Sequence, residues 1–323
     1  MKENRQVKIK AYAKINTYLD VLSKRSNGYH NIKSIMQTID LCDTLDISLA
    51  YDVSAWLTDS RNIKLSLSCT DPHIPTDGKN LVCKAVYAFY DKISERGYMI
   101  MPPSEICVTL VKNIPHEAGM GGGSADCAAM LRALNELEGR PFQAKELIDI
   151  GAALGADVPF CIVGGTAIVG GIGEEVCPVE SRAELIYVTA KSECGISTPR
   201  AFALLDEKYN NFSAAGSTDR DNNFLKMCSA YKSGITADVC GCLYNIFENV
   251  IADVCPDVPK AKQIMTDCGA YGALLSGSGP SVVGYFEDNE AGADKAAEAV
   301  KKLTENGYSS KLCHGAATTY FKI

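Results

Sequence analysis

A glycine-rich segment over residues 115–126 carries the strongest chemical signal in the chain. Four of the five positions 119–123 are glycine, and Ser124 follows directly. Glycines let backbone amides approach a ligand closely and adopt positive φ. We predict Ser124 to be the N-cap of the next helix, whose free N–H groups and dipole attract anions. The segment therefore predicts a cradle for the phosphates of a nucleotide triphosphate.

A plain turn between a strand and a helix is the alternative interpretation of this segment. Four glycines exceed what a turn requires, which favours phosphate binding. The segment is not a Walker A loop, because no Gly-Lys-Ser/Thr follows, and its spacing does not fit the dinucleotide fingerprint. A second glycine-rich turn at Leu275–Ser281 is a weaker sign of the same kind of close approach.

Two charged residues far apart in the sequence fit phosphoryl transfer to an alcohol. That chemistry uses a carboxylate at the hydroxyl and a cation near the transferring group. Lys14 lies on the same polar strand face as Asn16, and Asp157 follows the Gly155 that ends a helix. By spacing alone, a solvated lysine and a turn aspartate are the commoner interpretations. The chemistry favours Lys14 and Asp157 as a catalytic pair.

Tyr29 and His30 follow the turn residues 26–28. An exposed aromatic ring can stack on a nucleobase, and an imidazole can hydrogen-bond the edge of that base. A loop that packs on the core explains the same two residues equally well.

Hydrophobic periodicity predicts the elements that position these residues. Alternation from Val7 to Val21 predicts a strand with one buried and one polar face. Capping residues and glycine stops predict helices over 80–96, 124–138, 144–154, 259–268 and 291–304. Apolar runs predict strands over 45–49, 63–67, 106–111, 160–163, 166–169, 185–189 and 281–286 and near the C-terminus. Glu207–Asn223 is poor in large apolar residues, which predicts a surface loop. The pattern predicts an α+β fold in two domains, 1–160 and 161–323.

Composition limits the partners and the compartment. The 323 residues carry a net charge of −7, which argues against binding to nucleic acid. Residues 1–10 are polar, and the longest near-apolar run, 160–173, is short and glycine-rich, so we expect neither a signal peptide nor a membrane helix. The 14 cysteines are scattered and the four histidines lack zinc spacing, so we expect reduced thiols, no dedicated metal site and a cytoplasmic protein.

Taken together and in this order, the motifs resemble those of the GHMP kinases. Within these they most closely resemble the kinases of 4-diphosphocytidyl-2-C-methyl-D-erythritol in the non-mevalonate isoprenoid route. The matching segments are Ala13–Asn16, Asn27–His30, Asp43–Leu45, Ile114–Ala129, Leu154–Pro159 and Ser276–Pro280.

The resemblance implies an N-terminal domain like ribosomal protein S5 domain 2, a ferredoxin-like C-terminal domain and an active site between them. It implies transfer of the γ-phosphoryl of ATP, which brings Mg²⁺ with it, to the 2-hydroxyl of the small cytidyl substrate. A monomer or a homodimer is compatible with this expectation. The alternatives are a GHMP kinase for another small alcohol, such as mevalonate or homoserine, and a non-catalytic scaffold that binds a ligand.

Roles for individual residues follow from the resemblance by matched position. Asp157 is then the general base, and Lys14 orients the hydroxyl and stabilises charge. The implied ATP-binding residues are Pro115, Ala118, Gly119, Gly121, Gly122, Gly123, Ser124 and Ala125. The implied substrate-binding residues are Asn16, Tyr29, His30, Thr198 and Phe202. The chain departs from the family pattern at Tyr12, where proline is usual, and at Ala125, where a second serine is frequent.

Overall fold

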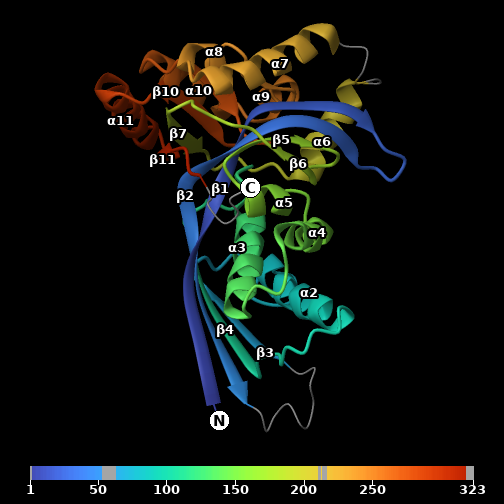
Figure 1. The fold of residues 1–323 in the computed structure, drawn as a ribbon. Helices are drawn as coiled ribbons and strands as arrows, with labels where there is room; N and C mark the ends of the chain where they lie inside the picture. The colour runs from blue at the N-terminus through green and yellow to red at the C-terminus, as the bar shows by residue number, and fades with distance from the viewer. Residues whose placement is uncertain (1, 53–62, 210–211, 213–216, 318–323) are drawn as a thin grey trace.

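The computed structural model describes residues 2–52, 63–209, 212 and 217–317. Its strands form two sheets, of seven and of four strands, and helices pack against both. This arrangement confirms the predicted α+β class. Figure 1 shows an elongated molecule, with the larger sheet running from the lower tip to the upper half.

Two long antiparallel strands, β1 (Lys2–Lys24) and β2 (His30–Asp52), form the backbone of the larger sheet. The predicted strand over 7–21 is confirmed and extends further in both directions. A register shift between Tyr12 and Lys14 interrupts the pairing just before the lysine. Such bulges change the direction in which nearby side chains point. The remaining strands of this sheet are β3 (Lys64–Cys69), β4 (Glu105–Val111), β5 (Thr166–Gly170), β6 (Glu175–Pro178) and β8 (Tyr244–Asn245).

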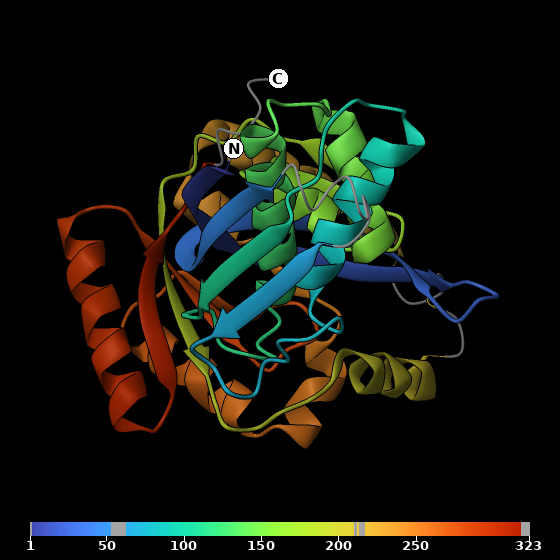
Figure 2. The same cartoon turned by 90° about the horizontal axis from the view of Figure 1, so that it is seen from below.

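Helices cover one face of the larger sheet, as Figures 1 and 2 show. They are α2 (Leu81–Glu95), α3 (Gly122–Leu137), α4 (Ala144–Leu154) and α5 (Val158–Val163). Helix α3 lies against β1, and every residue from Ala125 to Asn135 is buried. Small residues such as Ala128 and Ala129 let this helix pack closely, which fixes the position of its N-terminus relative to β1.

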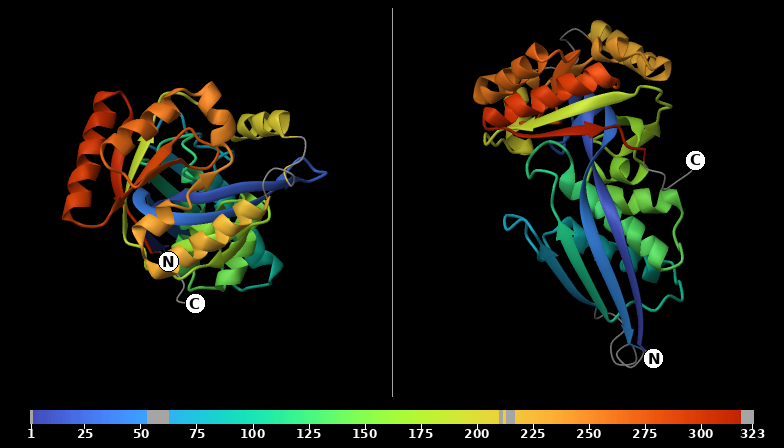
Figure 3. Two further views of the ribbon diagram at one scale, coloured as in Figure 1. Left: turned by 90° about the horizontal axis from the view of Figure 1, so that it is seen from above. Right: turned by 90° about the vertical axis from the view of Figure 1, so that its left-hand side faces the viewer.

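The smaller sheet has the strand order β11-β7-β10-β9 and is antiparallel throughout. Its strands are β7 (Leu185–Lys191), β9 (Gly272–Leu275), β10 (Val282–Glu287) and β11 (Ser309–His314). Helices α10 (Asp257–Asp267) and α11 (Glu290–Glu305) pack against these strands. This order is that of a split βαββαβ unit, as the ferredoxin-like expectation requires. Figure 3 shows this layer beside the upper part of the β1–β2 ribbon.

The segment between β7 and β9 contains four further helices. They are α6 (Thr198–Lys208), α7 (Ser217–Ser233), α8 (Thr236–Cys240) and α9 (Glu248–Val254). The surface loop predicted over Glu207–Asn223 is wrong at both ends, because α6 reaches Lys208 and α7 begins at Ser217. Residues 210–211 and 213–216 of that prediction lie outside the described residues.

Two other expectations are also corrected. The run 160–163 is helical rather than a strand, because Pro159 stands in the first turn of α5 and Gly164 ends it. A four-residue apolar run does not distinguish a buried strand from a buried helix. Cys194 and Cys255 form a disulfide, whereas we expected reduced thiols throughout.

The domain boundary near residue 160 stays a prediction. Strands β5 and β6 follow it in the sequence, end at Pro178 and pair within the larger sheet. Over the ranges that the structure describes, every helix is too short or too polar to cross a bilayer.

Candidate active site

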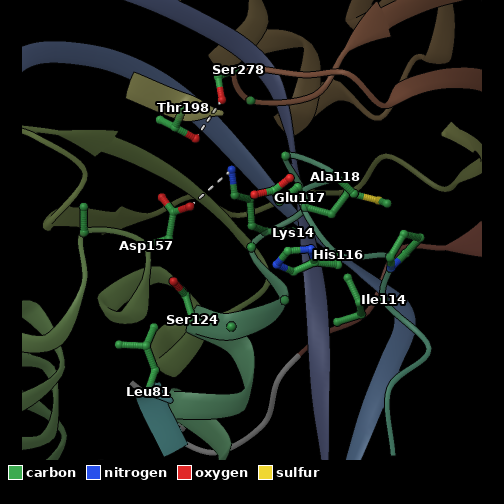
Figure 4. Close-up of a pocket in the computed structure, with 18 of the residues that line it drawn as sticks. Lys14, Leu81, Ile114, His116, Glu117, Ala118, Ser124, Asp157, Thr198 and Ser278 are labelled. Carbon is green, nitrogen blue, oxygen red and sulfur yellow. Dashed lines mark hydrogen bonds and ion pairs between the residues drawn. The ribbon is translucent and has the colours of Figure 1, made fainter. Parts of the chain in front are cut away.

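A cavity of about 530 Å³ lies where β1, the start of α3 and the C-terminal region meet. Figure 4 shows several of its lining side chains. Most of the residues that the sequence singled out line this cavity: Lys14, Asn16, Pro115, Ala118, Gly119, Gly121, Gly122, Gly123, Ser124, Asp157, Thr198 and Phe202. Tyr29, His30 and Ala125 are not among its lining residues. Ala125 is instead buried in α3.

Lys14 and Asp157 face each other in the cavity, as Figure 4 shows. The Lys14 Nζ lies 3.4 Å from the Asp157 Oδ2 and donates to the Asn16 Oδ1 at 2.9 Å. Only 5% of the Lys14 side chain is exposed, compared with 31% for Asp157. The lysine is therefore not the solvated surface residue that its position on a polar strand face favours. The cavity holds a buried cation beside a carboxylate that a ligand can reach.

A chain of hydrogen bonds fixes the Asn16 amide. The Asn16 Nδ2 donates to the Ser34 Oγ at 2.8 Å, and the Ser34 hydroxyl donates to the Tyr18 carbonyl at 2.6 Å. This network leaves the Asn16 Oδ1 as the acceptor for Lys14. Asn16 thereby holds the ammonium in place next to Asp157.

The glycine-rich loop leaves no room for a side chain at Gly119 and little room at Gly121. Gly119 has φ +68°, and a Cβ there would lie 2.2 Å from the Ser276 carbonyl oxygen. Gly121 has φ +69°, and its Cβ would lie 3.0 Å from the Lys14 Cγ. The Lys14 N–H also donates to the Met120 carbonyl at 3.0 Å, which ties the loop to β1. The close approach that the glycines permit is therefore used to bring the loop against the lysine.

The start of helix α3 differs from the prediction. We expected Ser124 to be the N-cap, but Gly121 occupies that position in the left-handed conformation and the helix begins at Gly122. Because glycine adopts this conformation without strain, the helix starts three residues earlier than a serine cap would place it. Ser124 lies in the first turn, and its hydroxyl points into the cavity in Figure 4. The first N–H groups of a helix have no intrahelical partners, so those of this turn can still donate to an anion as predicted.

A buried ionic cluster, Asp43–Lys112–Asp126, supports both ends of the loop, and our sequence reasoning missed it. The Lys112 ammonium contacts the Asp43 carboxylate and lies 2.7 Å from the Asp126 Oδ2. The Asp43 Oδ1 accepts the backbone N–H groups of Asn113 and Ile114, where the loop begins, and Asp126 belongs to α3, where the loop ends. Asp43 belongs to one of the segments that match the GHMP kinases. Nothing in the sequence singles out Lys112 except that it directly follows a predicted strand.

The cluster contains one ammonium group and two carboxyl groups, so their charges do not balance if all three are ionised. Burial raises the pKa of Asp126 to about 7; the Lys112 ammonium opposes this shift and the Asp43 carboxylate adds to it. Burial alone would lower the pKa of Lys112, but the two carboxylates outweigh it and raise that pKa. The Asp126 Oδ1 has no hydrogen-bond partner within the part of the chain that the structure describes. One ammonium group is therefore shared by two carboxylates beneath the glycine-rich loop.

The second glycine-rich turn, at Leu275–Ser281, docks on the first. The Ser276 hydroxyl donates to the Gly119 carbonyl at 3.1 Å, and the Ser278 Oγ lies 3.0 Å from the Thr198 Oγ1. The Asn245 Nδ2 holds the turn by donating to two of its carbonyls, those of Leu275 and Gly277. The turn thus connects the glycine-rich loop of residues 119–123 with helix α6.

Aromatic residues occupy the α6 end of the site. Phe202 lines the cavity and stacks on the His30 ring, with centroids 4.6 Å apart. His30 is buried, while 59% of Tyr29 is exposed at the β1–β2 turn. The structure therefore brings His30 against Phe202 in the cavity wall and leaves Tyr29 exposed.

Relatives at the sequence level match nearly the whole chain. The model of the GHMP kinases N terminal domain matches residues 80–165, and that of the GHMP kinases C terminal region matches residues 234–306. The 4-diphosphocytidyl-2-C-methyl-D-erythritol kinase of Caldicellulosiruptor bescii is 36% identical over 310 residues, covering 96% of this chain and 99% of the relative. The enzyme of the same name from Clostridium kluyveri is 38% identical, covering 87% and 91%.

Solved structures share the fold at lower identity. A crystal structure of 4-(cytidine 5'-diphospho)-2C-methyl-D-erythritol kinase has a TM-score of 0.71 at 23% identity and covers 97% of this chain and all of its own. The mevalonate kinase of L. major, in complex with R-mevalonate, also has a TM-score of 0.71, at 14% identity, with coverage of 98% and 97%. From the sequence relatives, the chain belongs to the GHMP kinases, in the family of the 4-diphosphocytidyl-2-C-methyl-D-erythritol kinases.

Proposed function

We propose that the protein transfers the γ-phosphoryl of ATP to the 2-hydroxyl of 4-diphosphocytidyl-2-C-methyl-D-erythritol. The observation that carries this proposal is the Lys14–Asp157 pair, which faces the phosphate loop across one cavity. A carboxylate for the hydroxyl proton and a cation for the developing charge are what phosphoryl transfer to an alcohol requires. The cytoplasmic setting and the monomeric or dimeric state stay predictions.

The loop and the start of α3 are the site for the ATP phosphates. Backbone N–H groups from Gly119 to Ser124 donate to phosphate oxygens, and Pro115 and Ala118 shape the entrance of the loop. The oxygens of Ser124 and Asp157 face the same cavity and are the hard ligands that Mg²⁺ prefers. These two residues would therefore hold an Mg²⁺ that enters with ATP, where it neutralises phosphate charge.

Asp157 and Lys14 divide the work at the acceptor hydroxyl. The hydroxyl oxygen forms a bond to the γ-phosphorus while the bond to the bridging oxygen of ATP breaks, and ADP leaves. Asp157 accepts the hydroxyl proton, and Lys14 stabilises the negative charge on the transferring group. Because Asn16 fixes Lys14, the cation is already in place before the transfer, which lowers the cost of reorganisation.

The cytidyl half of the substrate binds at the α6 end of the cavity. Tyr29 and Phe202 provide aromatic faces for the base, His30 an edge, and Asn16 and Thr198 polar contacts. Stacking on an aromatic side chain contributes about 1–3 kcal/mol per base. Mevalonate and homoserine have no base, so they would leave these aromatic groups without a partner.

The fold alone does not select among these acceptors, because a kinase of each class is equally similar in structure. The choice rests on the sequence relatives and on the aromatic cluster. A non-catalytic scaffold would need neither the buried lysine nor the carboxylate beside it. Both alternatives are separated from the proposal by one assay.

The test is ADP release, measured by coupled assay, with the cytidyl substrate, mevalonate and homoserine as acceptors. We expect turnover with the cytidyl substrate at least a hundredfold above that with either other alcohol, since a site built for a polar group rejects analogues that lack it by about that factor or more. A reaction without acceptor measures background ATP hydrolysis. Turnover with mevalonate or homoserine alone would replace the proposed substrate, and ligand binding without any turnover would support the scaffold.

A further inference from the structure

His30 is held on three sides. Its Nε2 lies 2.8 Å from the Oδ1 of Asp206, on helix α6. Phe202 stacks on one face of the ring, and Phe212 meets the ring edge-on with centroids 5.7 Å apart. Only 4% of the His30 side chain is exposed. The imidazole therefore has a fixed orientation.

Asp206 decides which nitrogen of His30 carries the proton. Burial alone would raise the pKa of Asp206, but hydrogen bonds from Lys24 and His30 outweigh it and lower that pKa, so the carboxylate is ionised. An ionised carboxylate only accepts hydrogen bonds, so the Nε2 of His30 must carry a hydrogen. In the neutral imidazole the Nδ1 then has a lone pair and no hydrogen. Across the described ranges of the chain, no hydrogen-bond partner lies at this Nδ1.

We propose that Asp206 is a positioning residue that makes the enzyme select cytosine over uracil. By holding the hydrogen on the Nε2 of His30, it leaves the Nδ1 as an acceptor for the 4-amino group of cytosine. Uracil has a carbonyl at this position, which cannot donate and would face the lone pair. This inference rests on the proposed function, because it names how that function recognises the base of its substrate.

The surrounding rings fit a base in this orientation. The planes of His30 and Phe202 differ by 21°, so a base hydrogen-bonded in the plane of His30 would lie nearly parallel to Phe202 as well. Phe202 lines the cavity, and the exposed Tyr29 precedes His30 in the chain. A base can therefore stack and hydrogen-bond at once, as in other sites that read single bases.

The first experiment measures the tautomer without using activity. Protein labelled with ¹⁵N at histidine gives ring-nitrogen shifts that distinguish a protonated from an unprotonated Nδ1, and His30→Gln assigns the signal. We expect the Nε2–H form in the unaltered protein. In Asp206→Asn we expect a mixture, because an amide can donate to or accept from the Nε2. Asp221→Asn is the matched control, since Asp221 also lies 2.6 Å from a lysine Nζ but touches no histidine. An Nδ1–H form in the unaltered protein, or a tautomer unmoved in Asp206→Asn, would overturn the proposal.

The second experiment compares kcat/KM for the cytidyl substrate and its uridine analogue. We expect Asp206→Asn to lower the preference for cytidine about tenfold, through KM rather than kcat, because one hydrogen bond to the base is weakened. Asp221→Asn should keep the preference of the unaltered enzyme. A preference that Asp206→Asn leaves intact rejects the positioning role. If the unaltered enzyme phosphorylates neither nucleotide, the proposed function fails, while the tautomer measurement still stands by itself.

Discussion

The two ends of the cavity are formed by different parts of the chain, one mainly by backbone groups and the other by side chains. At the end where we propose that the ATP phosphates bind (the phosphate end), residues 119–124 form the surface, and the buried cluster Asp43–Lys112–Asp126 supports it from below. At the end where we propose that the base binds (the base end), Phe202 of α6 lines the cavity and stacks on His30, and Tyr29 of the β1–β2 turn is largely exposed. Packing and buried charge fix the surface of the phosphate end. A few aromatic side chains, which other residues could replace, form the base end.

This difference explains why the fold is shared more widely than the substrate. Every ATP-dependent member must hold the same phosphates, and a backbone cradle needs only glycines and a helix start to do so. Side chains at the other end can change without disturbing that cradle. The structures of a cytidyl-methylerythritol kinase and a mevalonate kinase accordingly match this chain with the same TM-score of 0.71.

The largest effect is expected from breaking the buried cluster at the phosphate end. Lys112→Met would leave Asp43 and Asp126 facing each other without their cation. Removing one partner of a buried ion pair costs about 3–5 kcal/mol, so we expect the free energy of unfolding to fall by that amount in urea titrations. Lys64→Met is the matched control, because Lys64 also lies 2.7 Å from a carboxylate but is 77% exposed, and we expect no measurable change. Equal losses in the two variants would show that the cluster does not support the loop.

Asp157 lies where the two ends meet, so its loss should stop the reaction without removing either ligand. We expect Asp157→Asn to lower kcat about a hundredfold or more, because the general base is lost, while ATP still binds at the glycine-rich loop. Steady-state kinetics with each substrate varied in turn separate these quantities. Full activity in this variant would remove Asp157 from the proposed mechanism.

The dependence of the phosphate end on its backbone can be tested at Gly119. In Gly119→Ala the new Cβ would lie 2.2 Å from the Ser276 carbonyl oxygen at a positive φ, so the loop must move. Since strain of this kind costs about 1–3 kcal/mol, we expect KM for ATP to rise about tenfold or more. Gly139→Ala is the control, because Gly139 also has a positive φ, +78°, but nothing lies within 4 Å of its Cβ. That variant should lose only stability, seen as a lower thermal midpoint with unchanged KM.

Local patterns in the sequence predicted some features of the site and missed others. Strand alternation placed Lys14 and Asn16 on one face, and the structure brings them within hydrogen-bond distance. Four glycines directly before a helix predicted a phosphate-binding loop, because a plain turn does not require so many. The exact start of α3 was missed, since the left-handed Gly121 caps the helix in place of Ser124. Local patterns thus predict elements and their faces better than the residues at which elements begin.

Contacts between distant segments could not be predicted from local patterns. Nothing near Lys112 in the sequence indicates that Asp43 and Asp126 surround it, because β2 and α3 bring these residues together only in the folded chain. The approach of Asp206 to His30 is of the same kind, since it depends on how α6 packs against the β1–β2 turn. Chemistry alone suggested that Lys14 and Asp157 act together, and their 3.4 Å separation comes from the fold.

A smaller effect is expected from the titration of Asp126. Its pKa is about 7 in the folded protein and about 4 when unfolded. Between pH 4 and 7 the folded state therefore holds a proton that the unfolded state has lost, so this group's contribution to stability is full below pH 4 and falls as the pH rises to 7. Asp126→Asn has no titrating group at this position, so its stability relative to the unaltered protein should rise by about 3 kcal/mol between pH 4 and pH 7. Urea unfolding at both pH values measures it, and a pH-independent difference would mean that Asp126 is ionised throughout.

The smallest effect is expected at the base end, where one exposed ring can be removed without disturbing the fold. In Tyr29→Ala the base loses one of its two aromatic faces, which is worth about 1–3 kcal/mol, so KM for the cytidyl substrate should rise about tenfold. KM for ATP and the free energy of unfolding should stay unchanged, because Tyr29 is 59% exposed and is not among the residues that line the cavity. Tyr271→Ala is the control, since Tyr271 is also about half exposed, at 51%, but lies in the C-terminal sheet region. If Tyr29→Ala instead raised KM for ATP, the two ends would not be separable, and base recognition would have to be assigned to the same backbone that holds the phosphates.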